Sequence, residues 1–152
     1  MQIRAGLRLL TVLRQILESA EPEEGCALLL GERFSDSWRL GWVWPCCNVW
    51  PLPEERRFRF AIDPREQMLA QKWGRQRGLE ILGSAHSHPA SGAVPSATDC
   101  SLSALPALMV ILGAGGVPAQ QASPQPDRRE LLGWWIPEPP SPPQHLPWRM
   151  EL

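Results

Sequence analysis

Two histidines spaced to share one face constrain this chain more than any other feature. His86 and His88 follow the apolar segment 79–85 and are separated by a single residue. Alternate residues of an extended strand point to the same side, about 7 Å apart, so both imidazoles can face one spot. Seven residues, rich in small side chains and proline, separate His88 from Ser96, and two more separate Ser96 from Asp99. This order predicts a strand, a reversal and a helix that returns Asp99 to the two histidines.

Two imidazoles and one carboxylate form a metal-binding set. A zinc ion held by His86, His88 and Asp99 keeps one tetrahedral position for water, which is the arrangement of a catalytic zinc site rather than a structural one. Cys100 is a further candidate ligand, but neighbouring side chains on a helix diverge by about 100°, which disfavours it. Zinc deaminases also activate water, but they use His-x-Glu with a later Cys-x-x-Cys, and this chain has neither. We therefore predict one Zn²⁺ per chain, bound by the two histidines and the aspartate.

Ser96 and Asp99 also match the start of a helix. Serine is a favoured N-cap, and an aspartate in the first turn faces the positive end of the helix dipole. Leu102, Leu105 and Leu108 follow as an apolar run. The capping and metal-binding interpretations are compatible, because a carboxylate fixed at a helix N-terminus is rigidly aimed and can still bind a metal.

The full spacing of His86, His88, Ser96 and Asp99 resembles the zinc signature of the JAMM metalloproteases, the catalytically competent branch of the MPN (Mov34/MPN/PAD-1) family. The resemblance covers about residues 7–136 and is to small, stand-alone bacterial members. It implies an MPN fold of the three-layer, cytidine deaminase-like kind and hydrolysis of isopeptide or peptide bonds beside ubiquitin-like modifiers. It also implies that Ser96 is catalytic, with its hydroxyl bonding the carbonyl oxygen as negative charge develops there.

The same resemblance implies a catalytic glutamate far upstream, which we assign to Glu24. Glu24 lies in the family's pattern over residues 22–31, at the entry to an apolar segment, although Ala27 stands where glycine is common. In this role Glu24 accepts a proton from water and later passes it to the leaving amine, without binding the metal. From the residues alone, a glutamate at such a turn is more often a solvated surface group, and we expect that role for Glu21 and Glu23.

Length and net charge indicate one domain with no electrostatic case for binding polyanions. A chain of 152 residues can bury a core of its own. The net charge of −1 gives no electrostatic reason to bind nucleic acid or an anionic membrane, and no apolar segment is long enough to span a bilayer. The four cysteines include no Cys-x-x-Cys, so we expect reduced thiols in a cytoplasmic protein: Cys26, Cys46, Cys47 and Cys100.

The expected fold is a single α/β domain with a mixed β-sheet flanked by helices. An amphipathic helix over about residues 9–20 is favoured over a signal peptide, because Arg14 and Gln15 interrupt the apolar run. Asp63 as N-cap starts a second helix that ends before Gly78. Strands are expected at residues 26–31, 38–44, 48–50, 57–60, 79–85, 108–112 and 131–136.

The segment 57–60 alternates arginine with phenylalanine, which has two interpretations. Arginines interleaved with aromatic residues occur on nucleic-acid-binding surfaces. Strict alternation favours a strand with Phe58 and Phe60 facing the core and Arg57 and Arg59 facing water.

The C-terminal part of the chain is richer in proline than the rest. Nine of the 17 prolines fall in the last forty residues. We therefore expect a catalytic domain over residues 1–136 and a proline-rich tail over 137–152, with 137–147 extended on the surface and outside any sheet. The tail could bind an aromatic groove on a partner, although a solvated tail is the simpler interpretation. Residues 113–129, rich in Gly, Ala, Gln and Pro, are expected to form a long mobile loop.

Together these features predict a zinc metallopeptidase. The resemblance favours cleavage after the C-terminal Gly-Gly of a ubiquitin-like sulfur-carrier protein. An extended tail can pair with an exposed sheet edge, glycines can approach a metal closely, and the small residues of loop 90–94 leave that approach open. The alternatives are a deubiquitinase-like isopeptidase of wider range, or an MPN scaffold that binds protein partners without catalysis.

Overall fold

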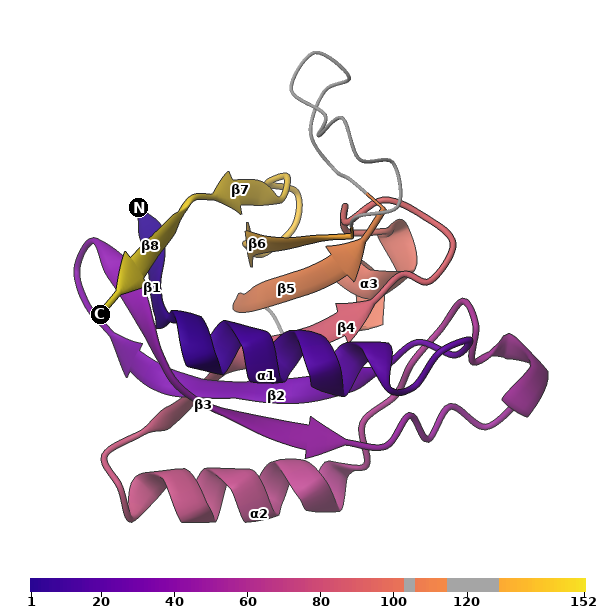
Figure 1. The fold of residues 1–152 in the computed structure, drawn as a ribbon, viewed down its shortest axis with the longest axis horizontal. Helices are drawn as coiled ribbons and strands as arrows, with labels where there is room; N and C mark the ends of the chain where they lie inside the picture. Colours follow the sequence, from indigo (N-terminus) through magenta and orange to yellow (C-terminus); the bar gives the residue numbers. More distant parts are fainter. Residues whose placement is uncertain (103–105, 115–128) are drawn as a thin grey trace.

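Eight strands form one curled, mixed sheet (Figure 1). The two outermost strands of this sheet follow one another in the chain. The computed structural model describes residues 1–102, 106–114 and 129–152. The strand order is β7-β6-β5-β4-β2-β3-β1-β8. The elements are β1 (Gln2–Gly6), α1 (Leu7–Glu18), β2 (Cys26–Arg33), β3 (Ser37–Cys46), the 3-10 turn η1 (Pro53–Glu55), α2 (Pro64–Arg75), β4 (Glu80–Ser87), α3 (Ala97–Leu102), β5 (Ala107–Gly113), β6 (Glu130–Ile136), β7 (Gln144–Leu146) and β8 (Trp148–Glu151).

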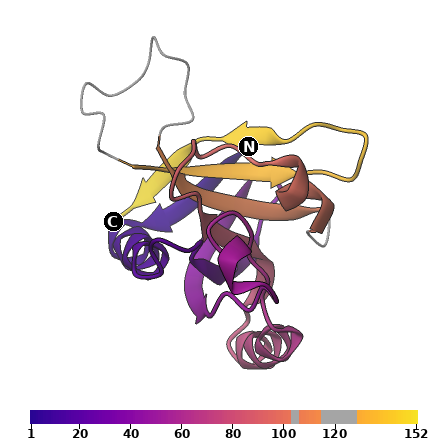
Figure 2. The same cartoon turned by 90° about the vertical axis from the view of Figure 1, so that its right-hand side faces the viewer.

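Helices α1 and α2 lie against opposite faces of the sheet (Figure 2). Strand β2 shows this alternation, because Leu29 packs into the core cluster with Leu13 and Leu17 of α1, whereas Leu28 packs with Ala70 of α2. The side chains of Leu13, Leu17 and Leu29 are fully buried. The expected α/β architecture, a mixed sheet with flanking helices, is therefore confirmed.

The helix α2 begins and ends near the residues that the sequence predicted. The side chain of Asp63 accepts a hydrogen bond from the backbone N–H of Arg65, as expected of an N-cap, and Pro64 is the first helical residue. The helix is followed by Gly78, whose φ of +70° is a left-handed conformation that glycine adopts without steric cost.

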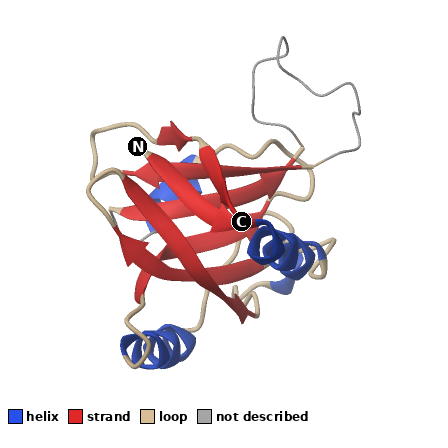
Figure 3. Ribbon diagram, turned by 60° about the vertical axis from the view of Figure 1, so that its left-hand side comes forward, coloured by secondary structure: helices blue, strands red, loops and turns tan. Residues whose placement is uncertain are grey.

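The proline-rich tail contributes two strands to the sheet, so the expectation that residues 137–147 lie outside it was wrong. β7 pairs antiparallel with β6, β8 pairs parallel with β1, and only Pro147 separates the two strands (Figure 3). The prolines cluster at 137–143 and at 147, so the three residues of β7 keep their backbone N–H groups for pairing. The indole of Trp148 also donates to the carbonyl of Leu131, 2.8 Å away. The tail thus links the two outer strands of the curled sheet.

We expect Leu146→Ala to lower the free energy of unfolding by about 2–5 kcal/mol, because the leucine side chain is fully buried in the main core. Met150→Ala in β8 is the matched control, since that side chain is 47% exposed. Chemical denaturation of both variants measures the difference. Equal, small losses for the two variants would contradict a structural role for the tail.

Three expectations about the segment before α2 were wrong. β3 continues through Pro45 to Cys46, and residues 48–50 are not a strand. Residues 57–60 are not a strand either: residues 56–58 form a turn after η1, in which the N–H of Phe58 donates to the carbonyl of Glu55, and the Phe58 side chain is 69% exposed. A period of two over four residues does not distinguish a strand from such a turn. Strand β1, by contrast, was not expected.

Most of the expected loop over residues 113–129 lies outside the described residues, as does Leu105. In the part of the chain that is described, no helix combines the length and apolar character needed to cross a membrane.

Candidate metal centre

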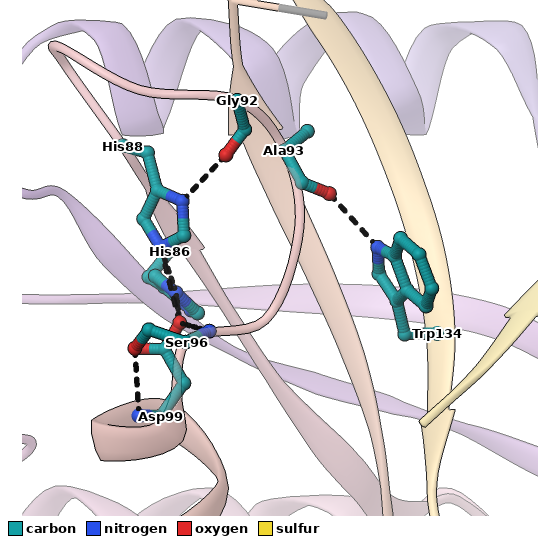
Figure 4. A network of polar contacts seen from close by, with 7 residues as sticks. All are labelled: His86, His88, Gly92, Ala93, Ser96, Asp99 and Trp134. Carbon is teal, nitrogen blue, oxygen red and sulfur yellow. Dashed lines mark hydrogen bonds and ion pairs between the residues drawn. The ribbon is translucent and has the colours of Figure 1, made fainter. Parts of the chain in front are cut away.

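Three potential ligand atoms converge beneath the loop between β4 and α3 (Figure 4). The Nε2 atoms of His86 and His88 are 3.0 Å apart, and each lies 3.1 Å from Oδ2 of Asp99. All three side chains are buried. Bonds of 2.0–2.1 Å to a tetrahedral zinc would separate neighbouring ligand atoms by about 3.3 Å. The sequence-predicted trio is therefore brought together at separations that suit a shared metal ion.

The β-ladder places the two histidines on one side. His86 lies within β4, and His88 follows its last residue but stays extended, because its N–H donates to the carbonyl of Leu112 in β5 at 2.8 Å. The backbone thus continues in strand geometry past the end of β4 and presents both rings to the same space.

Asp99 is fixed at the start of α3 by a reciprocal pair of hydrogen bonds. Its N–H donates to Oγ of Ser96 at 3.0 Å, and its Oδ2 accepts from the N–H of Ser96 at 2.9 Å. The expected capping role is confirmed, and the same Oδ2 faces the two imidazoles. Capping and metal binding are therefore geometrically compatible in this chain.

The imidazole of His88 is oriented by a bond on its far side. Its Nδ1 lies 2.8 Å from the carbonyl oxygen of Gly92. A carbonyl can only accept, so Nδ1 carries the hydrogen and Nε2 of the neutral ring keeps its lone pair for a metal. The buried Nδ1 of His86 has no partner among the described residues, but its ring stacks on Phe60, with centroids 4.5 Å apart.

The charge of the cluster also suits a divalent cation. Burial lowers the pKa of His86, which favours the neutral ring that binds metals. Burial would raise the pKa of Asp99, but hydrogen bonds from His86 and His88 hold it well below its usual range. One carboxylate and two imidazole nitrogens are a donor set found in zinc and other transition-metal sites.

Glu24 lies beside this cluster at the entry to β2. In the ladder, Cys26 pairs with His86, and the peptide of Gly25 exchanges hydrogen bonds with Ser87: its N–H donates to the serine Oγ at 2.8 Å and its carbonyl accepts from the serine N–H at 3.0 Å. Glu24 is only 3% exposed, and its Oε2 has no hydrogen-bond partner among the described residues. Burial raises the pKa of Glu24 to about 8; His88 opposes this rise and the Asp99 carboxylate adds to it. A buried carboxyl with an unused oxygen is suited to proton transfer.

The raised pKa of Glu24 predicts a pH-dependent stability in the metal-free protein. The proton bound to Glu24 favours the folded state below pH 4.5, and this contribution is lost as the pH rises through about 8. Glu24→Gln, which is neutral throughout, should therefore gain stability relative to wild type, by up to about 4 kcal/mol, as the pH rises from 5 to 9. Denaturation in the presence of chelator measures this, and a difference that does not change with pH would contradict the assignment.

The cysteines are not part of the ligand group. All four are free, and the cluster within the described residues consists of His86, His88 and Asp99 alone. Burial raises the pKa of Cys26 to about 12, and burial together with Asp99 raises the pKa of Cys100. Both thiols therefore stay protonated at neutral pH, which disfavours metal binding.

The roles of three residues around the site were not predicted from the sequence. Trp134 of β6 donates its indole N–H to the carbonyl of Ala93 at 2.9 Å, and so holds the loop next to Gly92 (Figure 4). Ser87 lies between the two histidines, yet its bond is to Gly25, which is 62 residues away in the sequence. Phe60 was expected in the core and instead covers His86.

A separate apolar groove of about 790 Å³ lies between the start of α1 and β3. Leu7, Val12 and Trp42 are among its lining residues, and none of the metal-site residues is. The candidate site is thus defined by converging polar atoms and lies apart from this groove.

Comparison with known proteins places the chain in a family. Residues 7–130 match the family of prokaryotic homologs of the JAB domain, Prok-JAB. Desampylase from Haloferax volcanii is 32% identical over 91 residues, which is 60% of this chain and 62% of that protein, so the match spans less than two thirds of that relative.

Solved structures agree over nearly the whole chain. The solution structure of a protein from Desulfitobacterium hafniense gives a TM-score of 0.77 at 28% identity and covers 99% of this chain and 95% of its own. A protein from Salinibacter ruber gives 0.67 at 25% identity, covering 99% and 92%.

Proposed function

The chain belongs to the Prok-JAB family of prokaryotic JAB-domain homologs, and from that premise we propose that it is a zinc-dependent metallopeptidase or isopeptidase. Its substrate in this proposal is an amide bond after the C-terminal Gly-Gly of a ubiquitin-like sulfur-carrier protein. The observation that carries the proposal is the cluster of His86, His88 and Asp99 beside the buried carboxyl of Glu24.

His86, His88 and Asp99 would hold the metal through two Nε2 atoms and Oδ2. A zinc ion bound there supplies Lewis-acid chemistry, lowering the pKa of water and polarising a carbonyl. The protein contributes a nearly dry site, since the exposed fractions of the three residues are 0%, 6% and 7%. Exclusion of water strengthens the electrostatic interactions within the site.

Glu24 is the proton-transfer residue in this mechanism. Its carboxylate accepts a proton from the attacking water and then donates that proton to the departing amine nitrogen. Burial raises its proton affinity, which suits a group that must both take up and release a proton near neutral pH.

Ser96 stabilises the carbonyl oxygen in this proposal. Its Oγ accepts the bond from the N–H of Asp99, which leaves the hydroxyl hydrogen free to donate, and the residue itself is exposed. Removing one such donor typically lowers kcat about 10²–10³-fold, and we expect that loss for Ser96→Ala. Steady-state kinetics measures the loss, with Ser91→Ala in the same loop as the control. A fall in kcat of less than threefold would remove Ser96 from the catalytic role.

The buried site favours a thin, extended substrate segment. The ligand atoms are almost inaccessible, so glycines can approach them where larger side chains would clash. Strand β3 lies between β2 and β1, but β1 pairs with it only at residues 37–39. Over residues 40–46, none of the described strands pairs with the side of β3 that faces away from β2. This edge ends at Cys46, which pairs with Cys26 near Glu24. An extended tail added to β3 would therefore run toward the site.

The desampylase relative supports a ubiquitin-like substrate. That relative is named a desampylase, and a ubiquitin-like substrate for the present chain is part of our proposal. An isopeptidase of wider range is the second candidate, because the same residues would serve it. The presence of the full ligand set and Glu24 argues against a non-catalytic scaffold.

Cleavage of designed fusions tests the substrate. The zinc-loaded protein is incubated with carrier proteins extended beyond Gly-Gly, with carriers in which Ala-Ala replaces Gly-Gly, and with unrelated peptides. We expect product masses that correspond to hydrolysis after the second glycine only. Hydrolysis of unrelated peptides without cleavage of the fusions would reject the carrier substrate while leaving a zinc hydrolase in place.

A further inference from the structure

We infer that Asn48 is a positioning residue for the proposed catalytic centre. Its single carboxamide ties the backbone of Glu24 to the turn that carries Phe60, and so aligns the proton-transfer group with the ring that packs on His86. The catalytic part of this inference rests on the proposed function, whereas its structural part does not.

The amide of Asn48 is fully used by backbone groups. Its Nδ2 donates to the carbonyls of Glu24 at 3.0 Å and Arg59 at 2.9 Å, with a longer contact of 3.4 Å to Arg56. Its Oδ1 accepts from the N–H groups of Trp50 at 3.1 Å and Ala61 at 3.2 Å. Two donors and two acceptor positions are the full capacity of an amide side chain. Asn48 therefore joins three separate stretches of backbone at one point.

Glu24 depends on this junction for its position. Its carbonyl accepts from Asn48, and its N–H donates to the carbonyl of Arg56 at 2.8 Å. Both polar groups of the Glu24 backbone are thus held by the turn that Asn48 organises. Because Oε2 of Glu24 has no partner of its own among the described residues, the aim of the carboxyl group relies on this backbone anchoring.

Phe60 is held by the same amide from both sides. The residue before it, Arg59, and the residue after it, Ala61, each bond to Asn48. The Phe60 ring stacks on His86 at an interplanar angle of 21°. Metal-binding histidines usually donate their second N–H to a partner, as His88 does, but the Nδ1 of His86 has none among the described residues. Packing against Phe60 takes the place of that bond in orienting His86.

No smaller or charged side chain reproduces this junction. Alanine would leave the carbonyls of Glu24 and Arg59 and the N–H groups of Trp50 and Ala61 without their shared partner, and unpaired polar groups in such a partly buried junction are costly. Aspartate would keep an acceptor for Trp50 and Ala61 but turn a negatively charged oxygen toward the carbonyls of Glu24 and Arg59. We therefore expect a specific loss at the site when Asn48 is replaced.

Amide hydrogen exchange tests the structural part in the metal-free protein. In Asn48→Ala, we expect the N–H groups of Glu24 and Ala61 to exchange at least about tenfold faster, while core amides such as that of Leu29 keep their protection. Val49→Ala is the control, because its side chain is 40% exposed and its bond to Ala61 comes from its backbone. Unchanged protection of Glu24 in Asn48→Ala would overturn the inference.

Kinetics with saturating zinc tests the catalytic part. Replacing a residue that supports a metal site without touching the metal typically costs about 10–100-fold in activity, and we expect that loss in kcat for Asn48→Ala, with KM changed less than twofold. In a Glu24→Gln background, Asn48→Ala should have little further effect, because it acts through Glu24. A kcat within twofold of wild type, or an undiminished effect without Glu24, would overturn the catalytic role.

If Asn48→Ala does not fold, hydrogen exchange of the wild-type protein tests the inference instead. The N–H groups of Glu24, Trp50 and Ala61 should then exchange with one common opening free energy, since one amide links them. Exchange of Glu24 more than about tenfold faster than Ala61 would overturn the inference. A wild-type protein that cleaves no substrate would reject the proposed function, and the exchange data would still decide whether Asn48 fixes Glu24.

Discussion

Glu24→Gln is expected to lower kcat by about 10²–10⁴-fold while the bound metal is unchanged, because an amide cannot accept the proton from water. Glutamine has nearly the same shape, and Oε2 of Glu24 makes no hydrogen bond among the described residues that the substitution would break. The loss of activity therefore comes from proton transfer and not from a loss of the fold or of the metal. Cleavage kinetics on a carrier fusion, together with elemental analysis, measures both quantities.

Glu23→Gln is the matched control for this prediction. Glu23 is next in the chain but more exposed, and it has no part in the proposed chemistry. It should cleave like wild type. A Glu24→Gln enzyme with wild-type kcat would mean that another group is the base, and a Glu24→Gln protein without metal would mean that Glu24 is a ligand.

His86→Ala is expected to lose most of the bound metal and essentially all activity. His86 supplies one of only three protein ligands in the proposed site, and its side chain is fully buried, so no neighbouring surface group can replace it. Elemental analysis after dialysis measures the metal directly, and circular dichroism shows whether the fold is retained.

The chain contains one histidine outside the cluster, and it provides the control. His145 packs edge-on against Trp134, with ring centroids 5.2 Å apart, and is exposed. His145→Ala should keep the full complement of metal. If His86→Ala retained as much metal as His145→Ala, the site as described would be incorrect.

The parts of the site that the sequence predicts are local. His86, His88, Ser96 and Asp99 lie within fourteen residues, and their geometry follows from strand alternation and helix capping. The N-cap of α2 at Asp63 is local in the same sense. Such features depend on neighbours in the chain, so residue types and spacing are enough to predict them.

The features that the sequence did not predict depend on distant contacts. Strand β7 exists because β6 lies beside it, and the prolines around it concealed a three-residue pairing segment. Phe60 faces His86 because Asn48 fixes the turn around it, and nothing in the alternation of 57–60 records that bond. Glu24 needed the family resemblance to distinguish it from Glu21 and Glu23, since only the folded chain buries it.

A zinc titration of the metal-free protein, with cleavage of a carrier fusion as the readout, tests the central claim most directly. The proposed site predicts no cleavage without metal, a rate that rises in proportion to added zinc, and saturation at one zinc ion per chain. Full cleavage by the metal-free protein, or a rate that does not change as zinc is added, would contradict the assignment of a metal-dependent hydrolase.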